Sequence, residues 1–491
     1  MTKKLFPALW LCFLSIQTLF AQYQLGLTTS GFGGTHLVYA NPAFLANPRH
    51  HVYVNLASAQ FGATNNYVRY EGGLKFGNIS DISFDKDKLT YDNSGKTKFL
   101  STGFDIRLPS VLVAMSPKHS IALTSRARLL VQGRNFNQEF AQIIVEGIDL
   151  DKFQNKPFEN YSFNAGAYGF SELALSYARV IKDDEKSSLK AGITFKKLNG
   201  YAAAYVNAQD FSFQLNTEPD PNLPIEEQTV ANIKNISLQY GYVDPSVIGN
   251  LTPAQVIFGN GLPGSGIGFD FGASYEKKAE NSRYPMDYQY RIGFALMDIG
   301  GVRFKSSSAI QAYNITRTNK KLVLDDFDDI DTDDDDDYAE QVQSVINNAL
   351  DITPNEKKDN LKFGLPTTMN VNFDYRIYKK VYVNAFWIQG LRSQKSTAAY
   401  PLSVFSVTPR VQMKWLEVAL PVSLVNNYKN LAVGAMARLG FLYVGTDNLA
   451  GALGGGSIYG TDFYFGLNIP VFQRKREGRS DESTEEIESS K

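Results

Sequence analysis

Charged side chains recur inside stretches where polar and apolar residues alternate, and they are the first candidates for chemistry. Asp374 and Arg376, for example, stand between the apolar residues Phe373, Tyr375 and Ile377. Successive side chains of a strand point to opposite faces, so each stretch has an apolar face and a charged face. The pattern predicts a network of ion pairs on the charged faces, built from Asp105, Arg126, Arg128, Asp270, Glu276, Arg291, Asp374, Arg376, Arg410 and Arg438.

Such a network has two interpretations. Charges removed from bulk water need partners or bound water, so the network can simply be a lattice that stiffens the fold. Alternatively, the same charges can line a charge-selective path for a substrate. We favour the lattice and keep the path as the alternative.

A run of aspartates at 325–337 is the second candidate. Asp329, Asp331 and Asp333 have the spacing of the first ligands of a calcium loop. The run has no glycine at the required turn and no acidic residue that closes the site, so a solvated loop is the favoured interpretation. A loosely bound Ca²⁺ is the alternative, and we expect no other cofactor.

Catalysis requires a nucleophile, a base or a metal set. The chain has four histidines, His36, His50, His51 and His119, and none stands in such a constellation. We therefore expect that the protein is not an enzyme.

Composition narrows the class of protein. The 491 residues carry 49 Lys and Arg against 50 Asp and Glu, so nothing indicates a nucleic-acid partner. Aromatic residues make up 13% of the chain, which favours strands. The single cysteine, Cys12, lies in a segment that we expect to be removed.

Residues 1–21 have the pattern of a secretory signal peptide. Lys3 and Lys4 precede an apolar run at 5–20 that is short for a membrane span. We see no other apolar run of about 18 residues, so no transmembrane helix is expected. An exported chain that sits in a membrane without such helices must do so as a β-barrel.

The connections between alternating stretches indicate the architecture. One group is short and polar, at 117–119, 182–186, 378–380 and 426–430. The other is long and irregular, at 77–98, 135–159, 218–231, 305–360 and 448–460. Short turns at one end and long loops at the other are typical of an outer-membrane barrel. Tandem soluble β-sandwiches, the alternative, would have turns every 8 to 12 residues.

We therefore predict an all-β protein, a transmembrane antiparallel outer-membrane β-barrel formed by residues 51–472. The barrel has about 14 strands, within a range of 12–16 that depends on whether 202–216 and 235–242 span fully. Apolar side chains face lipid and the charged set faces the lumen. The stretch 305–360 becomes a long acidic extracellular loop, and the tail at 473–491 a disordered periplasmic segment.

A hatch segment is expected at 22–50, where a glycine-rich lead precedes Asn41, Pro42 and Ala43. This element resembles the N-terminal hatch of the long-chain fatty-acid transporter type of barrel. Further stretches resemble an uncharacterised outer-membrane barrel family of Bacteroidota, related to that transporter group and to the type 9 secretion shuttle barrels; they are 416–421, 426–429 and 445–449.

The resemblance implies an outer-membrane location and a hatch inside the lumen. The function expected from it is passage or binding of small hydrophobic or amphipathic molecules. A non-transporting barrel that serves as partner or scaffold of a secretion or surface-assembly machine is the main alternative. A general porin is the third hypothesis. Expected partners are outer-membrane lipid, a hydrophobic small molecule or a secretion-system component.

Overall fold

The computed structural model describes residues 23–71, 88–148, 150–220, 227–244, 251–279, 287–305, 310–328, 330, 335–449 and 459–473. The predicted signal peptide and nearly all of the predicted tail lie outside these ranges. None of the described helices is long and apolar enough to cross a membrane.

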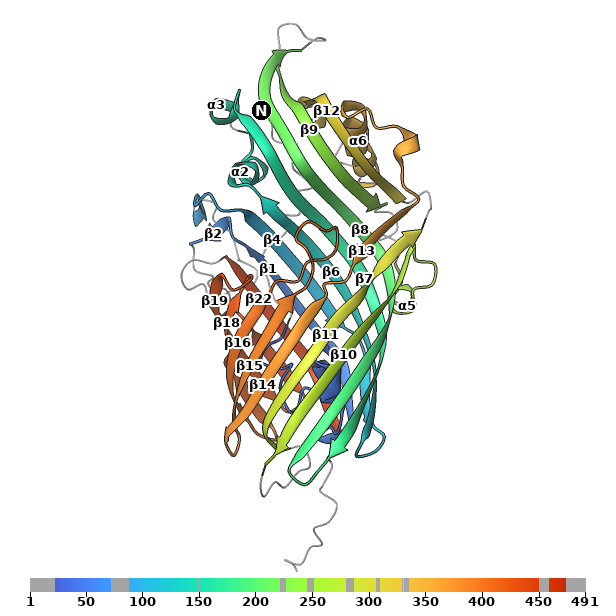
Figure 1. Ribbon diagram of the computed structural model, residues 1–491, viewed down its shortest axis with the longest axis vertical. Helices are drawn as coiled ribbons and strands as arrows, with labels where there is room; N and C mark the ends of the chain where they lie inside the picture. Colours follow the sequence, from blue (N-terminus) through green and yellow to red (C-terminus); the bar gives the residue numbers. More distant parts are fainter. Residues whose placement is uncertain are drawn as a thin grey trace, which may run out of the picture.

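The core of the molecule is a closed antiparallel barrel with a wall of 14 strands, four of which are broken into two segments (Figure 1). The wall segments are β1 (His50–Asn65), β4 (Lys98–Arg107), β5 (Ser110–Ala114), β6 (His119–Phe136), β7 (Pro157–Asp183), β8 (Ser187–Pro219), β10 (Gly264–Lys278), β11 (Tyr288–Lys305), β13 (Asn360–Gly364), β14 (Thr368–Tyr378), β15 (Val381–Gly390), β16 (Val404–Gln412), β17 (Leu416–Ala419), β18 (Val422–Val425), β19 (Asn430–Val433), β20 (Ala435–Leu439), β21 (Leu442–Thr446) and β22 (Gly460–Gln473). Pairing of β1 with β22, from His50 opposite Gln473 to Thr64 opposite Gly460, closes the ring. The predicted fold class is confirmed.

The two faces of the wall carry the side chains that alternation predicts. Phe373 and Tyr375 are 43% and 41% exposed on the outer face, whereas Asp374 between them is fully buried in the lumen. A soluble sandwich would bury the aromatic pair instead. The apolar face therefore meets lipid, as expected for an outer-membrane barrel.

Proline explains most of the breaks in the wall strands. Pro109 separates β4 from β5, Pro366 separates β13 from β14, and Pro421 separates β17 from β18. Proline lacks the N–H that a ladder needs, so pairing stops there and resumes one or two residues later. The fourth break falls at Gly434.

One end of the barrel carries the short turns, and the first and last residues of the wall, His50 and Gln473, also lie there. The other, the long-loop end, continues into a folded extension (Figure 1). Strands β7 and β8 run on beyond the wall, where β9 (Glu227–Val243) pairs with β8 and β12 (Ile310–Val323) pairs with β9. The helices α2 (Gln138–Glu146), α3 (Leu150–Phe153) and α6 (Asp335–Ala349) contribute to this part. Its core joins all these elements through Ile143, Phe153, Phe158, Phe213, Ile233, Tyr240, Tyr313, Leu324 and Leu350.

Three details of the structure differ from the prediction. Residues 202–216 and 235–242 lie mainly in its sheet, and the wall still has 14 strands. The stretch 305–360 is not irregular throughout, because it includes β12 and α6. The turn after β18 is short yet lies at the long-loop end, where Asn426 donates to Thr64 Oγ1 at 2.8 Å near the end of β1. Three successive residues with positive φ, Asn426, Asn427 and Tyr428, make that tight turn.

The hatch, residues 23–49, lies inside the half of the barrel near the short turns (Figure 1). It contains two 3₁₀ helices, η1 (Gly34–Tyr39) and η2 (Pro42–Leu45). Apolar hatch side chains pack against apolar residues of the wall, and the group includes Leu37, Val38, Phe44, Leu45, Leu112, Ala122, Ala178 and Phe386.

Candidate functional site

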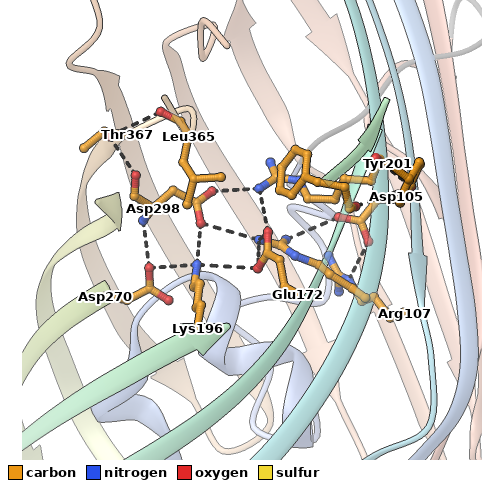
Figure 2. A network of polar contacts seen from close by, with 12 residues as sticks. Asp105, Arg107, Glu172, Lys196, Tyr201, Asp270, Asp298, Leu365 and Thr367 are labelled. Carbon is orange, nitrogen blue, oxygen red and sulfur yellow. Dashed lines mark hydrogen bonds and ion pairs between the residues drawn. The ribbon is translucent and has the colours of Figure 1, made fainter. Parts of the chain in front are cut away.

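The first ionic cluster of the lumen spans β4, β6, β7, β8, β10 and β11 (Figure 2). At its centre Glu172 accepts from Arg126 at 3.0 Å and from Arg128 at 3.1 Å. Lys196 lies 2.8 Å from Asp270 and also pairs with Asp298. Four cations face four carboxylates in this cluster: Arg107, Arg126, Arg128 and Lys196 against Asp105, Glu172, Asp270 and Asp298. The cluster is therefore neutral as a whole.

The second ionic cluster lies on β11, β14, β16, β17 and β20. Asp374 is 2.6 Å from Arg410 and 3.4 Å from Arg291, and it accepts from the hydroxyl of Tyr288 at 2.5 Å. Glu417 pairs with Arg438 at 3.3 Å. Three arginines thus face two carboxylates here.

Nine of the ten residues predicted for the network lie in these clusters or in the buried pair of Glu276 with Lys190, whose atoms are 2.6 Å apart. Arg376 lies apart, because its Nε donates to the Lys379 carbonyl at the turn after β14. The members that sequence reasoning missed are Arg107, Glu172, Lys190, Lys196, Asp298 and Glu417.

A β-bulge explains why Asp298 was not predicted as a member of the network. Strict alternation would place it with Leu296 on the lipid face. Its φ is 53°, and the register of β11 with β10 shifts between Phe269 and Phe271, so the side chain turns inward. The backbone N–H of Asp298 donates to Asp270 Oδ1 at 2.7 Å and fixes the bulge. An aspartate followed by Gly300 and Gly301 was the available signal.

The hatch motif contacts the wall where two glycines leave room. Asn41 caps η2 by accepting from Ala43 N, and its Nδ2 donates to the carbonyls of Ala273 and Phe294 at 3.0 and 3.1 Å. A Cβ on Gly192 would lie 2.4 Å from the Pro42 carbonyl carbon, and one on Gly272 would lie 2.0 Å from Asn41 Oδ1. Gly192 therefore allows hatch and wall to touch backbone to backbone, and Gly272 leaves room for the Asn41 side chain.

Aromatic rings of the hatch lie on the arginines of both clusters. Arg107 and Arg126 sit over Tyr39 at 4.3 and 4.5 Å from its ring centre. Arg291 sits over Phe44 and Arg438 over Phe32, each at 4.1 Å. Cation–π contacts of this kind are favourable when desolvated. The arginines of the clusters therefore bind the hatch as well as their carboxylate partners.

Above the ionic clusters the lumen contains an apolar layer that was not predicted. Its buried side chains come from several sides of the wall: Leu130, Tyr168, Phe170, Leu198, Val302, Phe304, Phe363 and Leu365. The bulge at Asp298 reverses the faces of β11 and directs Val302 and Phe304 inward. Phe170 stays on the same face of β7 as Glu172, because the extra residue at the register shift with β8 is Tyr201.

A connecting segment closes the long-loop end of the lumen. We call residues 391–403, between β15 and β16, the strap. Its backbone carbonyls accept from wall side chains of β6, β7 and β8: Gln394 from Asn164, Lys395 from Asn207, Ser396 from Arg134, Thr397 from Tyr168 and Tyr400 from Gln132. Ala399 is fully buried within the apolar layer. The strap therefore lies across the lumen.

The aspartates proposed for Ca²⁺, Asp329, Asp331 and Asp333, lie outside the described residues. The four histidines are distributed between hatch and wall. His36 is buried, with Nδ1 2.6 Å from Arg107, while His50, His51 and His119 begin β1 and β6. No group of metal-binding type was found in the part of the chain that the structure describes.

Fold and site together define a closed outer-membrane β-barrel with a lumenal hatch and a strap. The chain belongs to a family of unknown function (DUF5723), which matches residues 42–447. No curated protein matches it.

Solved structures with a similar fold include two toluene transporters and a third barrel. The toluene transporter TbuX of Ralstonia pickettii is 8% identical with a TM-score of 0.38, covering 94% of this chain and 100% of its own. The toluene transporter TodX of Pseudomonas putida is 8% identical with a TM-score of 0.38, covering 90% and 95%. A Pseudomonas aeruginosa FadL homologue is 10% identical with a TM-score of 0.31, covering 92% and 98%. The fold assignment of this chain depends on its own strand pairing.

Proposed function

We propose that this protein is an outer-membrane barrel that binds small hydrophobic or amphipathic molecules and passes them through its lumen. The apolar layer is the observation that carries the proposal. A water-filled porin needs a polar interior, whereas here Phe170, Phe304 and Phe363 face inward beneath the strap. An apolar molecule that took the place of the strap in this layer would be removed from contact with water, which is favourable.

Passage requires the strap to move, and the nature of its contacts with the wall allows that. Five hydrogen bonds from wall side chains to strap carbonyls are each worth roughly 0.5–1.5 kcal/mol net. The displaced groups can form hydrogen bonds with water instead, so a ligand that buries apolar surface in the layer can displace the strap.

Uptake of a radiolabelled aromatic hydrocarbon by cells tests the proposal. The host needs a lipopolysaccharide outer membrane and no hydrocarbon channel of its own. We expect the intact protein to raise uptake above an empty vector, and deletion of 394–399 to raise it further. Lys395→Ala is the matched control, because Asn207 binds only the backbone carbonyl of Lys395. Uptake at the vector level for both intact and deleted proteins would contradict the proposal.

A scaffold role is the second candidate, and the folded extension favours it. A sheet with three helices stands beyond the barrel on a lumen that is closed by both hatch and strap. Purification from native membranes in mild detergent separates the two functions. A stoichiometric protein partner from a secretion or surface-assembly machine supports the scaffold, and a co-purified apolar molecule supports transport.

A further inference from the structure

Arg134, near the end of β6, differs from the other buried cations of the lumen. Arg134 is buried, with only 8% of the residue exposed. The other buried cations lie within 4.0 Å of a carboxylate: Lys98, Arg107, Arg126, Arg128, Lys190, Lys196, Arg291, Arg410 and Arg438. For Arg134 no carboxylate is found at that distance among the described residues. A buried charge without a counter-charge is costly.

The contacts of Arg134 leave most of its hydrogen-bonding capacity unused. Nη2 donates to the Ser396 carbonyl of the strap at 2.9 Å, and the guanidinium lies 5.2 Å from the ring centre of Tyr400. Nε and Nη1 are buried and have no hydrogen-bond partner within the described part of the chain. Two nitrogens of this guanidinium therefore have unused donors, one on each side of Nη2.

A cavity of about 40 Å³ adjoins Arg134. A buried water needs roughly 10–15 Å³, so there is room for about three water-sized groups. Residues of β4, β6, the strap and the turn after β18 line it: Thr97, Lys98, Phe99, Leu100, Ser101, Gln132, Arg134, Asn135, Gln394, Tyr400, Leu402, Asn427 and Lys429. Lys98 is already paired with Asp92. None of the lining residues that the structure describes is acidic, and Lys429 adds a second positive charge at the rim.

We propose that this cavity binds an oxyanion, a carboxylate or phosphate group, on Arg134. The unused donors of the Arg134 guanidinium can bind the oxygens of such a group through charge-assisted hydrogen bonds. The site is separate from the hatch and from both ionic clusters, and it does not depend on whether the barrel transports. Since Nη2 of the same residue binds the strap, an anion here contacts the side chain that fastens the strap to the wall.

Calorimetric titration of the mature chain in nonionic detergent tests the site with two anions, inorganic phosphate and acetate, at constant ionic strength. We expect at least one of them to bind at a single site. Arg134→Gln should weaken binding about tenfold or more, because a hydrogen bond to a charged group is lost. Binding of phosphate alone or of acetate alone assigns the class of oxyanion.

Two further variants make the test independent of folding. Lys429 is exposed, so Lys429→Glu should fold normally and weaken binding severalfold by placing a negative charge at the rim. Lys234→Glu makes the same charge change on β9, where the side chain is 73% exposed, and should leave binding unchanged. The proposal is overturned if neither anion binds the unmodified protein, or if Lys429→Glu binds as tightly as Lys234→Glu.

Discussion

Individual buried carboxylates hold the wall together because each neutralises more than one cation. Asp374 is fully buried between Arg291 and Arg410 and also accepts from Tyr288. Removing one partner of a buried pair costs roughly 3–5 kcal/mol, since the remaining charge is left uncompensated. A second arginine is stranded here, so the upper part of that range applies.

Asp374→Asn is therefore expected to lower the free energy of unfolding by about 4 kcal/mol. Guanidinium unfolding in detergent, followed by tryptophan fluorescence, measures it. Arg376→Gln is the matched control, because Arg376 is only partly buried and binds the turn carbonyl of Lys379. The control should stay within about 0.5 kcal/mol. Equal losses for the two variants would show that the second ionic cluster does not stabilise the barrel.

Single glycines of the wall decide whether the hatch can seat. A Cβ on Gly192 would meet hatch backbone at 2.4 Å, which cannot move without displacing η2. Gly192→Ala should therefore release the hatch and increase protease cleavage within 23–49 in otherwise intact barrels. On the neighbouring strand a Cβ on Gly268 would meet the flexible tip of Leu365 at 3.0 Å. Gly268→Ala should leave cleavage unchanged, and similar cleavage in both variants would contradict the seating.

At the scale of elements, alternation predicted most of the wall and failed where a strand leaves its regular register. Asp374, Arg410 and Arg438 lie on regular strands and face inward as their positions require. Asp298 lies at a bulge whose local signal is the pair Gly300 and Gly301 that follows it. Part of the apolar layer was missed for the same reason, since Val302 and Phe304 follow the bulge. Phe170 lies on a regular inward position of β7, which a single strand does not identify as part of a layer. The path of the strap depends on partners 188 to 268 residues away in sequence, which one sequence does not reveal.

The helix α2 depends on a carboxylate whose protonation can be tested. Glu139 accepts from Lys156 and, at 2.5 Å, from the hydroxyl of Tyr161. The hydrogen bond from Lys156 and then that from Tyr161 hold the pKa of Glu139 below its usual value. A depressed carboxyl pKa stabilises the folded form above the unfolded pKa of about 4.3. That stability is lost as the pH falls through the lower folded pKa.

The protection factors for amide hydrogen exchange in 138–146 should therefore fall in acid, beginning below about pH 4. Glu139→Gln removes the titrating group, so its exchange should be faster at neutral pH and should lack the acid-dependent step. Both side chains of the pair are more than a third exposed, so added salt should reduce the difference. An acid-dependent step that persists in Glu139→Gln would assign the effect to another group.

For the whole molecule, hatch and strap act as two barriers in series along one lumen. The hatch fills the half near the short turns, and the strap crosses the lumen near the long-loop end. A small ion must pass both, so the tighter remaining barrier limits the current when one is removed. This arrangement differs from a porin with an open channel, and it lets each closure respond to a different event.

Planar-bilayer recordings of three deletions test the series arrangement. Deletion of 31–46 and deletion of 394–399 should each leave the conductance for small ions near the level of the intact protein, because the other barrier remains. The double deletion should produce stable ion-conducting openings, since a wall of 14 strands encloses a lumen too wide for its own side chains to fill. Full conductance from the hatch deletion alone would mean that the strap is no barrier, and the apolar layer would then be open to the outside in the resting state.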